Sequence, residues 1–126
     1  EALGIADARD AVAGDFARRG ITVNPAHLAL TASTSEAYSL LFKVLCDPGD
    51  EVLIPDNAYG PNKAFADGEL QRMGITHQLY DPMDVADLAR RIGAQTKLVW
   101  LEAPGSVSME FPEVEPGYVL PVFVPA

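Results

Sequence analysis

The fold is decided by residues 28–61, LALTASTSEAYSLLFKVLCDPGDEVLIPDNAYGP. In and just before this stretch, the pattern of apolar residues predicts a strand over His27–Thr31, a helix over Thr34–Leu45 and a second strand over Glu51–Ile54. Helices and strands continue to alternate further along the chain. This order is typical of an α/β fold, in which a layered, mostly parallel sheet carries flanking helices.

Hydroxyl side chains gather where the first predicted strand gives way to the helix. Ser33, Thr34 and Ser35 occupy this turn, and Ser33 forms an S-x-x-E capping box with Glu36. The N-terminus of a helix carries roughly half a positive charge and amide groups without partners, so it can bind a phosphate without lysine or arginine. The turn is therefore a candidate anion site, although an ordinary helix cap also explains the capping box.

An aromatic residue follows the second predicted strand. The loop after this strand lifts Tyr59 away from the sheet, and ligands of open parallel sheets bind beyond the carboxyl ends of the strands. A phosphate and a flat ring could therefore bind at the same edge. The alternative is a turn tyrosine with a hydrated hydroxyl.

These residues resemble pyridoxal-phosphate enzymes of fold type I. Residues 1–55 resemble class I/II aminotransferases, in the helical segment GIADARDAVAGDFARRGITVNP and in the phosphate-binding segment that ends at Pro55. Residues 55–113, which include DNAYGPNKAFADGELQRMGITHQLYDP and TKLVWLEAPGSVSMEFP, resemble cystathionine β-lyase, of the cysteine/methionine-metabolism branch. The chain thus resembles a hybrid of two related families that join near residues 50–55, and its natural or engineered origin stays open.

The resemblance implies pyridoxal 5'-phosphate as the cofactor. It also implies that residues 1–126 form a single partial large domain of the PLP-dependent transferase fold. Ser33, Thr34 and Ser35 would bind the cofactor phosphate, and Tyr59 would stack on the pyridine ring. In the lyase branch this tyrosine also lies near the reacting amino acid, so a role in proton transfer is a second hypothesis.

Catalytic residues are not identified by the sequence. Lys43, Lys63 and Lys97 do not match the lysine that binds the cofactor in these families, and the pair Arg90–Arg91 is better explained by the dipole of a helix end than by substrate binding. A chain of 126 residues is about a third of such an enzyme. Because the chain also begins at Glu1 without methionine, we expect a fragment, and whether it has enzymatic activity stays open.

The first functional hypothesis is a fragment or hybrid of an amino-acid aminotransferase, whose parent reaction is transamination. The alternative within the superfamily is a carbon–sulfur lyase of the cystathionine β-lyase type. A hypothesis of another class is a non-catalytic scaffold or interaction fragment, which the missing lysine favours. A nucleotide-binding or receiver-like domain is disfavoured, because the sequence has no G-x-G-x-x-G motif, no P-loop and no clustered strand-end aspartates.

Composition restricts the partners of the protein. A net charge of −9 argues against binding to nucleic acid or to an anionic membrane surface, and no apolar stretch approaches the roughly twenty residues of a membrane-spanning helix. We therefore expect a cytoplasmic protein with a small amino-acid substrate, and a homodimer is a hypothesis because a truncated sheet leaves apolar surface. Cys46 is expected to be a small buried residue, and His27 and His77 lack the partners of a metal site.

The remaining elements follow the same alternation. Helices are predicted over Ile5–Arg18, over Asn62–Arg72 and from Asp84 onward, and strands over Ile75–Tyr80 and Lys97–Leu101. The inward face of the helix that begins at Thr34 is predicted to carry Ala37, Leu40, Leu41, Val44 and Leu45. After the last strand, Glu102 and Ser106 are as consistent with turn and cap residues as with cofactor contacts. The proline-rich tail 110–126 matches neither family and has no assigned role.

Overall fold

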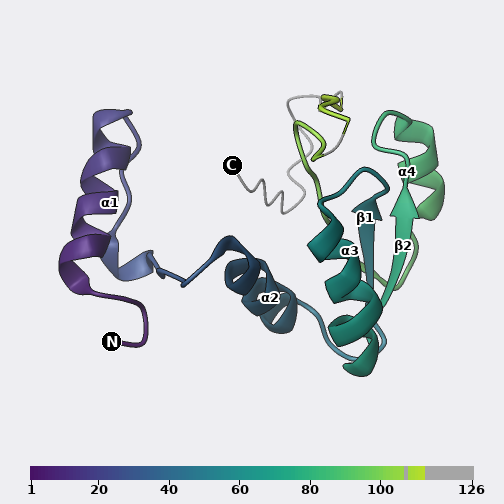
Figure 1. Ribbon diagram of the computed structural model, residues 1–126, viewed down its shortest axis with the longest axis horizontal. Helices are drawn as coiled ribbons and strands as arrows, with labels where there is room; N and C mark the ends of the chain where they lie inside the picture. Colours follow the sequence, from purple (N-terminus) through teal and green to yellow (C-terminus); the bar gives the residue numbers. More distant parts are fainter. Residues whose placement is uncertain (107, 113–126) are drawn as a thin grey trace. The chain divides into compact units, whose positions relative to one another are not determined.

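The computed structural model describes residues 1–106 and 108–112. The chain divides into two compact units, Glu1–Ala37 and Tyr38–Ala126, and each is described by itself. The elements in chain order are α1 (Ala6–Arg18), the 3-10 helix η1 (Pro25–His27), α2 (Thr34–Leu45), β1 (Glu51–Pro55), α3 (Gly60–Phe65), the π-helix η2 (Ala66–Leu70), β2 (Thr76–Tyr80), α4 (Val85–Arg91) and β3 (Thr96–Val99) (Figure 1). The proline-rich tail predicted over 110–126 lies outside the described residues from position 113 onward.

The first unit contains α1 and the segment that follows it. The helix begins after Ile5 and ends before Gly20, close to the predicted range. Gly20 has a φ of +79°, a conformation that glycine adopts without the steric penalty of a side chain, and this ends the helix. Nη1 of Arg9 then donates a 3.0 Å hydrogen bond to the carbonyl of Pro25, which ties α1 to η1.

The strand predicted over His27–Thr31 is wrong. The side-chain oxygen of Asn24 accepts a 2.9 Å hydrogen bond from the amide of Ala26 and so caps η1. The rest of the segment forms no regular element, and the amide of Leu30 donates a 3.0 Å hydrogen bond to the carbonyl of Leu3. A strand requires a continuous row of such bonds to its neighbour. One contact with a short N-terminal segment does not form a sheet.

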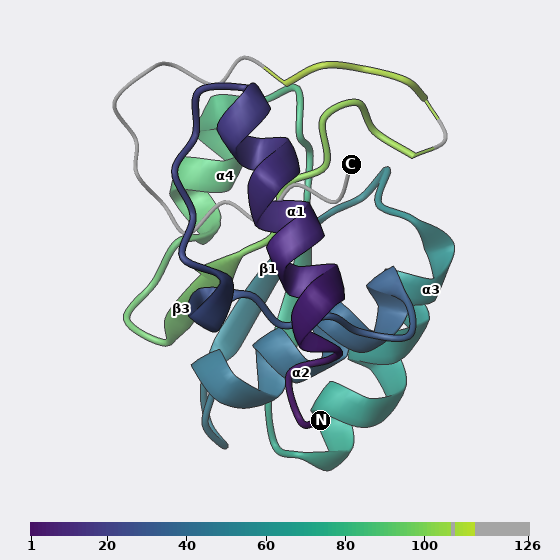
Figure 2. The ribbon, with the colours of Figure 1, turned by 90° about the vertical axis from the view of Figure 1, so that its left-hand side faces the viewer.

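The second unit contains a three-stranded parallel sheet in the order β2–β1–β3. Figure 1 shows β1 and β2 running in the same direction, and Figure 2 shows β3 beside β1. In the register of the sheet, Glu51 of β1 lies opposite Thr76 of β2 and Thr96 of β3. Because the strands are parallel, all three carboxyl ends lie at one edge. The parallel sheet expected from the alternating sequence pattern is therefore confirmed.

Apolar clusters cover both faces of this sheet. On one face, Val52 and Ile54 of β1 pack in a cluster with side chains of α2, α3 and η2. On the other face, Leu53 packs in a second cluster with Leu88 of α4. Successive side chains of a strand point to opposite faces, so the unbroken apolar run of β1 is typical of a central strand buried on both sides. The helices therefore flank the sheet, as predicted.

Two aromatic residues decide which face of α2 is buried. Tyr38 and Phe42 are 4% and 1% exposed, and the ring of Phe42 stacks on that of Trp100 with the centroids 5.4 Å apart. The bounds of the helix are those predicted, but its predicted inward face is wrong in part. Its exposed members are Leu40, Val44 and Leu45. Tyr38 and Phe42 lie four residues apart on one stripe of the helix, and their rings bury more apolar area than the aliphatic side chains do.

Two later elements differ from their predicted bounds. Helix α3 begins at Gly60, two residues before the predicted start, because Pro61 has the fixed φ that suits a first helical turn. The helix predicted as one piece continues through η2 as a π-helix. Strand β3 ends at Val99, before the predicted end, although Leu101 is still buried.

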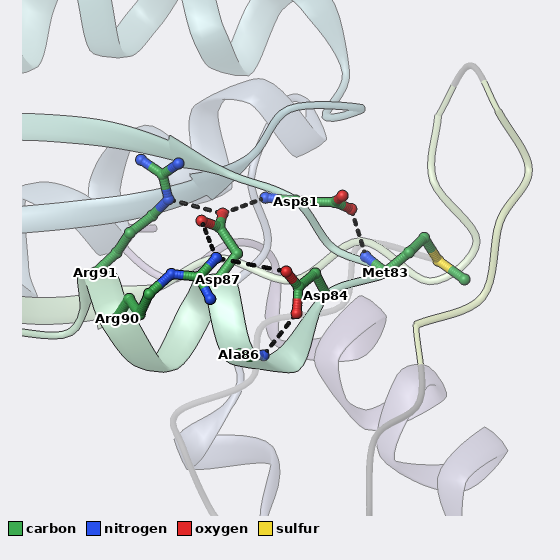
Figure 3. Close-up of polar contacts among 7 residues, drawn as sticks. All are labelled: Asp81, Met83, Asp84, Ala86, Asp87, Arg90 and Arg91. Atoms are coloured by element: carbon green, nitrogen blue, oxygen red, sulfur yellow. Dashed lines mark hydrogen bonds and ion pairs between the residues drawn. The ribbon is translucent and has the colours of Figure 1, made fainter.

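Helix α4 begins with the predicted aspartate cap. Oδ1 of Asp84 accepts a 2.9 Å hydrogen bond from the amide of Ala86. Asp87, in the first turn, accepts a 2.7 Å bond from Nε of Arg91 and a 2.9 Å bond from the amide of Asp81 (Figure 3). These contacts fix the start of α4 to the residue that follows β2.

Candidate functional site

The start of α2 carries the predicted capping serine. Oγ of Ser33 accepts a 3.1 Å hydrogen bond from the amide of Glu36. The carboxylate of Glu36 accepts a 2.7 Å bond from the amide of Ala32. In a capping box the glutamate binds the amide of the cap residue itself, whereas here it binds the amide before it. The amide of Ser33 is left available.

Three consecutive backbone donors are available at this turn. Among the described residues, the amides of Ser33, Thr34 and Ser35 have no hydrogen-bond acceptor, and all three residues are exposed. The hydroxyl of Thr31 donates a 2.9 Å bond to the carbonyl of Ser33, which orients that peptide group. Consecutive free amides at the start of a 12-residue helix fit a phosphate dianion.

Tyr59 occupies the N-cap of α3, beyond the carboxyl end of β1. Its amide donates a 2.9 Å hydrogen bond to Oε2 of Glu102, and its carbonyl accepts a 2.8 Å bond from the amide of Asn62. Both peptide groups of Tyr59 are thus held, while the residue is 50% exposed. A flat aromatic ring is therefore presented from a fixed backbone.

The carboxylate of Glu102 is buried where the chain leaves β3, with the residue 6% exposed. Besides the amide of Tyr59, it accepts a 2.7 Å hydrogen bond from Nδ2 of Asn62 and a 3.1 Å bond from Nε1 of Trp100. All three partners are donors, which suits an ionised carboxylate because that group can only accept. The three hydrogen bonds offset the unfavourable burial of the charge.

A second contact joins the loop after β1 to the loop after β3. Nδ2 of Asn57 donates a 2.9 Å hydrogen bond to Oγ of Ser108. Gly105 makes room for this amide, because a Cβ at that position would lie 2.2 Å from Nδ2 of Asn57. Within the first loop, Nζ of Lys63 donates a 2.8 Å bond to the carbonyl of Asp56. Glu102 and Asn57 therefore hold the two loops together at two separate points.

Burial favours the neutral form of two further groups near the sheet. The hydroxyl of Tyr80 donates a 2.7 Å hydrogen bond to the carbonyl of Trp100, and burial, followed by the negative charge of Glu102, raises the pKa of Tyr80. This phenol therefore stays a proton donor at neutral pH. Burial, followed by the charge of Asp50, also raises the pKa of the Cys46 thiol. The prediction that Cys46 is a small buried residue is confirmed.

His77 pairs with a carboxylate. Its Nε2 lies 3.4 Å from Oδ1 of Asp67. Within residues 1–106 and 108–112, no group of three or more histidine, cysteine, aspartate or glutamate residues is arranged to hold a metal ion. Over the same part of the chain, no helix combines the length and the apolar character needed to cross a lipid bilayer.

The predicted site residues fall in separate units. Residues 33–35 belong to the first unit and Tyr59 to the second, so their joint binding of one cofactor stays a prediction. Each part of the site is by itself suited to its predicted role: the free amides of residues 33–35 to the cofactor phosphate, and the ring of Tyr59 to one face of the pyridine ring. Sequence reasoning did not identify Glu102 as the residue that holds Tyr59. The signal in the sequence is an acidic residue directly after the apolar run 98–101. A charge next to a buried segment must find hydrogen-bond donors.

Known proteins similar to this chain include lyases and aminotransferases. The family model of the Cys/Met metabolism PLP-dependent enzymes matches residues 22–117. The cystathionine beta-lyase of Salmonella typhimurium is 33% identical over 95 residues, which are 75% of this chain and 22% of the relative. An alanine aminotransferase from Pyrococcus furiosus matches with a TM-score of 0.72 and 27% identity over 85% of this chain and 28% of that one. The cystathionine gamma-lyase of Lactobacillus plantarum matches with a TM-score of 0.61 and 28% identity, over 64% of this chain and 21% of that one.

These similarities confirm the resemblance to fold type I enzymes, both aminotransferases and lyases, and with it the cofactor, pyridoxal phosphate. The chain spans 17% to 25% of the length of three curated relatives that it matches. The family model, in contrast, extends over most of the sequence. The chain therefore belongs to the Cys/Met metabolism family of PLP-dependent enzymes.

Proposed function

We propose that this chain is the part of a carbon–sulfur lyase that binds pyridoxal phosphate, with an amino acid of the cystathionine type as substrate. One observation carries the proposal. In a chain of the Cys/Met metabolism family, the ring of Tyr59 is exposed at the carboxyl edge of the sheet and its backbone is held by Glu102. Transamination, the first hypothesis from the sequence, becomes the second candidate.

Two parts of the chain have separate roles in this proposal. The ring of Tyr59 stacks on the pyridine and excludes water from that face. The free amides of residues 33–35 bind the phosphate, and the partial positive charge at the start of α2 stabilises its negative charge. When bound, pyridoxal phosphate supplies an electron sink for bonds at the α-carbon of an amino acid.

The proposed reaction is a β-elimination from a thioether amino acid. A proton leaves the α-carbon, and the bond between the β-carbon and sulfur breaks. The sulfur takes up a proton and leaves as a thiol, and addition of one water to the remaining three-carbon unit gives pyruvate and ammonia. The hydroxyl of Tyr59, on an exposed residue at the edge of the sheet, is the proposed proton carrier in this chain.

Transamination is kept as a second candidate because of one specific observation. The alanine aminotransferase from Pyrococcus furiosus covers 85% of this chain, whereas the cystathionine gamma-lyase of Lactobacillus plantarum covers 64%. The two reactions differ in the fate of the amino group. A transaminase transfers it to a 2-oxo acid, whereas the lyase reaction releases it as ammonia.

The test uses the protein translated from its full reading frame, supplied with pyridoxal phosphate and L-cystathionine. The lyase proposal predicts equal amounts of thiol and pyruvate, measured with a thiol reagent and with lactate dehydrogenase. In a second assay, transfer of the amino group from L-alanine to 2-oxoglutarate without thiol release would support transamination instead. A protein that binds the cofactor without either reaction would support the non-catalytic scaffold.

Two variants of Tyr59 separate its two proposed roles. Tyr59→Phe keeps the ring and removes the hydroxyl, so it should retain cofactor affinity and lower kcat by roughly a hundredfold if the hydroxyl carries a proton. Tyr59→Ala removes the stacked ring and should weaken cofactor binding as well. Equal cofactor affinity in the wild type and in Tyr59→Ala would contradict the stacking role.

A further inference from the structure

We propose that Glu102 is a positioning residue: its carboxylate fixes the backbone of Tyr59 and thereby the direction in which the aromatic ring leaves the edge of the sheet. The inference rests on the proposed function only for the identity of the molecule that the ring contacts. The contact between Glu102 and Tyr59 lies wholly within the second unit.

The two oxygens of Glu102 have different partners. Oε1 accepts hydrogen bonds from Nδ2 of Asn62 at 2.7 Å and from Nε1 of Trp100 at 3.1 Å. Asn62 and Trp100 are each 2% exposed, so these bonds fix the carboxylate to the core. Oε2 accepts the 2.9 Å bond from the amide of Tyr59. One oxygen is thus held by the interior, and the other holds the exposed residue.

The backbone of Tyr59 is fixed on both sides of its α-carbon. Glu102 binds its amide, and the amide of Asn62 binds its carbonyl at 2.8 Å. With both peptide groups held, at a φ of −50° and a ψ of 125°, the direction of the Cα–Cβ bond is set. Among the described residues, no aromatic pair includes Tyr59. Backbone contacts, rather than packing against other rings, therefore orient this residue.

Among the described residues, the hydrogen-bond partners of the buried carboxylate are neutral donors. In the described part of the chain, no lysine, arginine or histidine forms a salt bridge with Glu102. A glutamine at this position keeps the shape but replaces one acceptor by a donor and removes the charge. Hydrogen bonds to an ionised acceptor are roughly twice as strong as neutral ones. Whichever way the new amide turns, the bond to Tyr59 is therefore lost or weakened.

The experiment compares the wild-type 126-residue chain with Glu102→Gln and with a matched control, Tyr80→Phe. The control removes another buried hydrogen bond of the same sheet, from the hydroxyl of Tyr80 to the carbonyl of Trp100, and neither Glu102 nor Tyr59 takes part in that bond. The probe is pyridoxamine 5'-phosphate, which has no aldehyde and does not react with lysines. Its fluorescence gives the dissociation constant, and nitrogen-15 NMR reports the exchange protection of the Tyr59 amide.

We expect Glu102→Gln to weaken binding of the probe by roughly tenfold and to reduce the exchange protection of the Tyr59 amide. Tyr80→Phe should leave the affinity within about twofold of the wild type and that amide unchanged, although it lowers stability. The proposal is overturned if the folded Glu102→Gln variant matches Tyr80→Phe in both measurements.

A second variant decides the matter if Glu102→Gln does not fold. Asn62→Ala removes one of the two donors that hold Oε1 and leaves the carboxylate in the protein. It should weaken probe binding severalfold in the same direction, and an unchanged affinity would overturn the proposal. Failure of the proposed function looks different. Cofactor stacking is rejected if the wild type does not bind the probe, or binds it no better than Tyr59→Ala does. In that case the exchange protection of the Tyr59 amide still tests the role of Glu102.

Discussion

Nδ2 of Asn62 lies 2.7 Å from Oε1 of Glu102, although 40 positions separate the two residues in the sequence. The hydrogen bond joins the first turn of α3 to the segment that leaves β3, and both groups are buried. A buried polar group that loses its partner is destabilised by more than the bond itself contributes. This relationship therefore links the stability of the second unit to the geometry around Tyr59.

Replacing Asn62 by alanine should lower the free energy of unfolding by about 1.5–3 kcal/mol, because the charged oxygen of Glu102 loses a hydrogen bond that is shielded from water. Trp100, the one tryptophan of the sequence, reports urea unfolding by its fluorescence. Lys63→Ala is the control, since Lys63 bonds to the carbonyl of the exposed Asp56 and should change stability by no more than about 0.5 kcal/mol. Equal effects of both substitutions would contradict the assignment.

The buried aromatic residues of α2 predict that two substitutions in this helix differ in their effect on stability. Phe42→Ala should destabilise the second unit by about 3–5 kcal/mol, because Phe42 is 1% exposed and stacks on Trp100. Val44→Ala lies two positions further along the same helix, but Val44 is 79% exposed, so its effect should stay within about 0.5 kcal/mol. Thermal unfolding of the two variants checks this difference. A large loss of stability in Val44→Ala would restore the inward face predicted from the sequence.

Two glycines predict changes of opposite sign. In Gly105→Ala the new Cβ would lie 2.2 Å from Nδ2 of Asn57 and displace that side chain from Ser108, which should destabilise the loops by about 1 kcal/mol. Gly14 lies inside α1, and a Cβ there meets no atom within 4 Å. Gly14→Ala should therefore stabilise the helix by about 0.5–1 kcal/mol. Urea unfolding measured by circular dichroism distinguishes the two, and a stabilising Gly105→Ala would show that the loops adjust freely.

Acid should weaken the start of α4 through Asp87. The hydrogen bond from Arg91 and then that from the amide of Asp81 lower the pKa of Asp87 to about 2, below the value of about 3.9 for an unfolded chain. The ionised group therefore contributes stability above about pH 4. This contribution is lost as the pH falls toward 2. Unfolding midpoints of the wild type and of Asp87→Asn should differ at pH 6 and converge near pH 2.

An exposed aspartate of another helix provides the control for this titration. Asp10 lies on the exposed side of α1, and within the described residues it forms no salt bridge. Asp10→Asn should leave the pH dependence of unfolding as in the wild type. If the difference between the wild type and Asp87→Asn were the same at pH 2 and at pH 6, the ion pairs of Asp87 would not be its cause.

Local signals in the sequence predicted the helices and the central strand. Ser33 marks the start of α2, and Asp84 caps α4, because a short polar side chain before an apolar run satisfies free amides. Partners distant in the sequence decide the rest. His27–Thr31 contains a short apolar run but lacks a paired neighbour strand in the described residues. The buried face of α2 is set by contact with Trp100, which a periodicity count cannot include.

The candidate site was predicted only in part, again because some of its contacts join residues that are distant in the sequence. The positions of Ser33 and Tyr59 at the start of a helix and at the end of a strand follow from neighbouring residues. The acceptor that holds Tyr59 comes from Glu102, 43 positions later. Nothing near Tyr59 in the sequence indicates that its amide is bound by a buried carboxylate. The contact forms because the parallel sheet brings the carboxyl ends of β1 and β3 to one edge.

The order of strands in the sheet has a consequence for how the protein is assembled. Glu51 of β1 pairs with Thr76 of β2 and with the later Thr96 of β3, and closing a longer loop has the larger entropic penalty. We therefore expect β3 to join the sheet last. Glu102 arrives with it, so Tyr59 acquires its backbone support only in the final stage of folding. A nascent chain that has not yet incorporated β3 would already display the tyrosine, but without a defined direction for its ring.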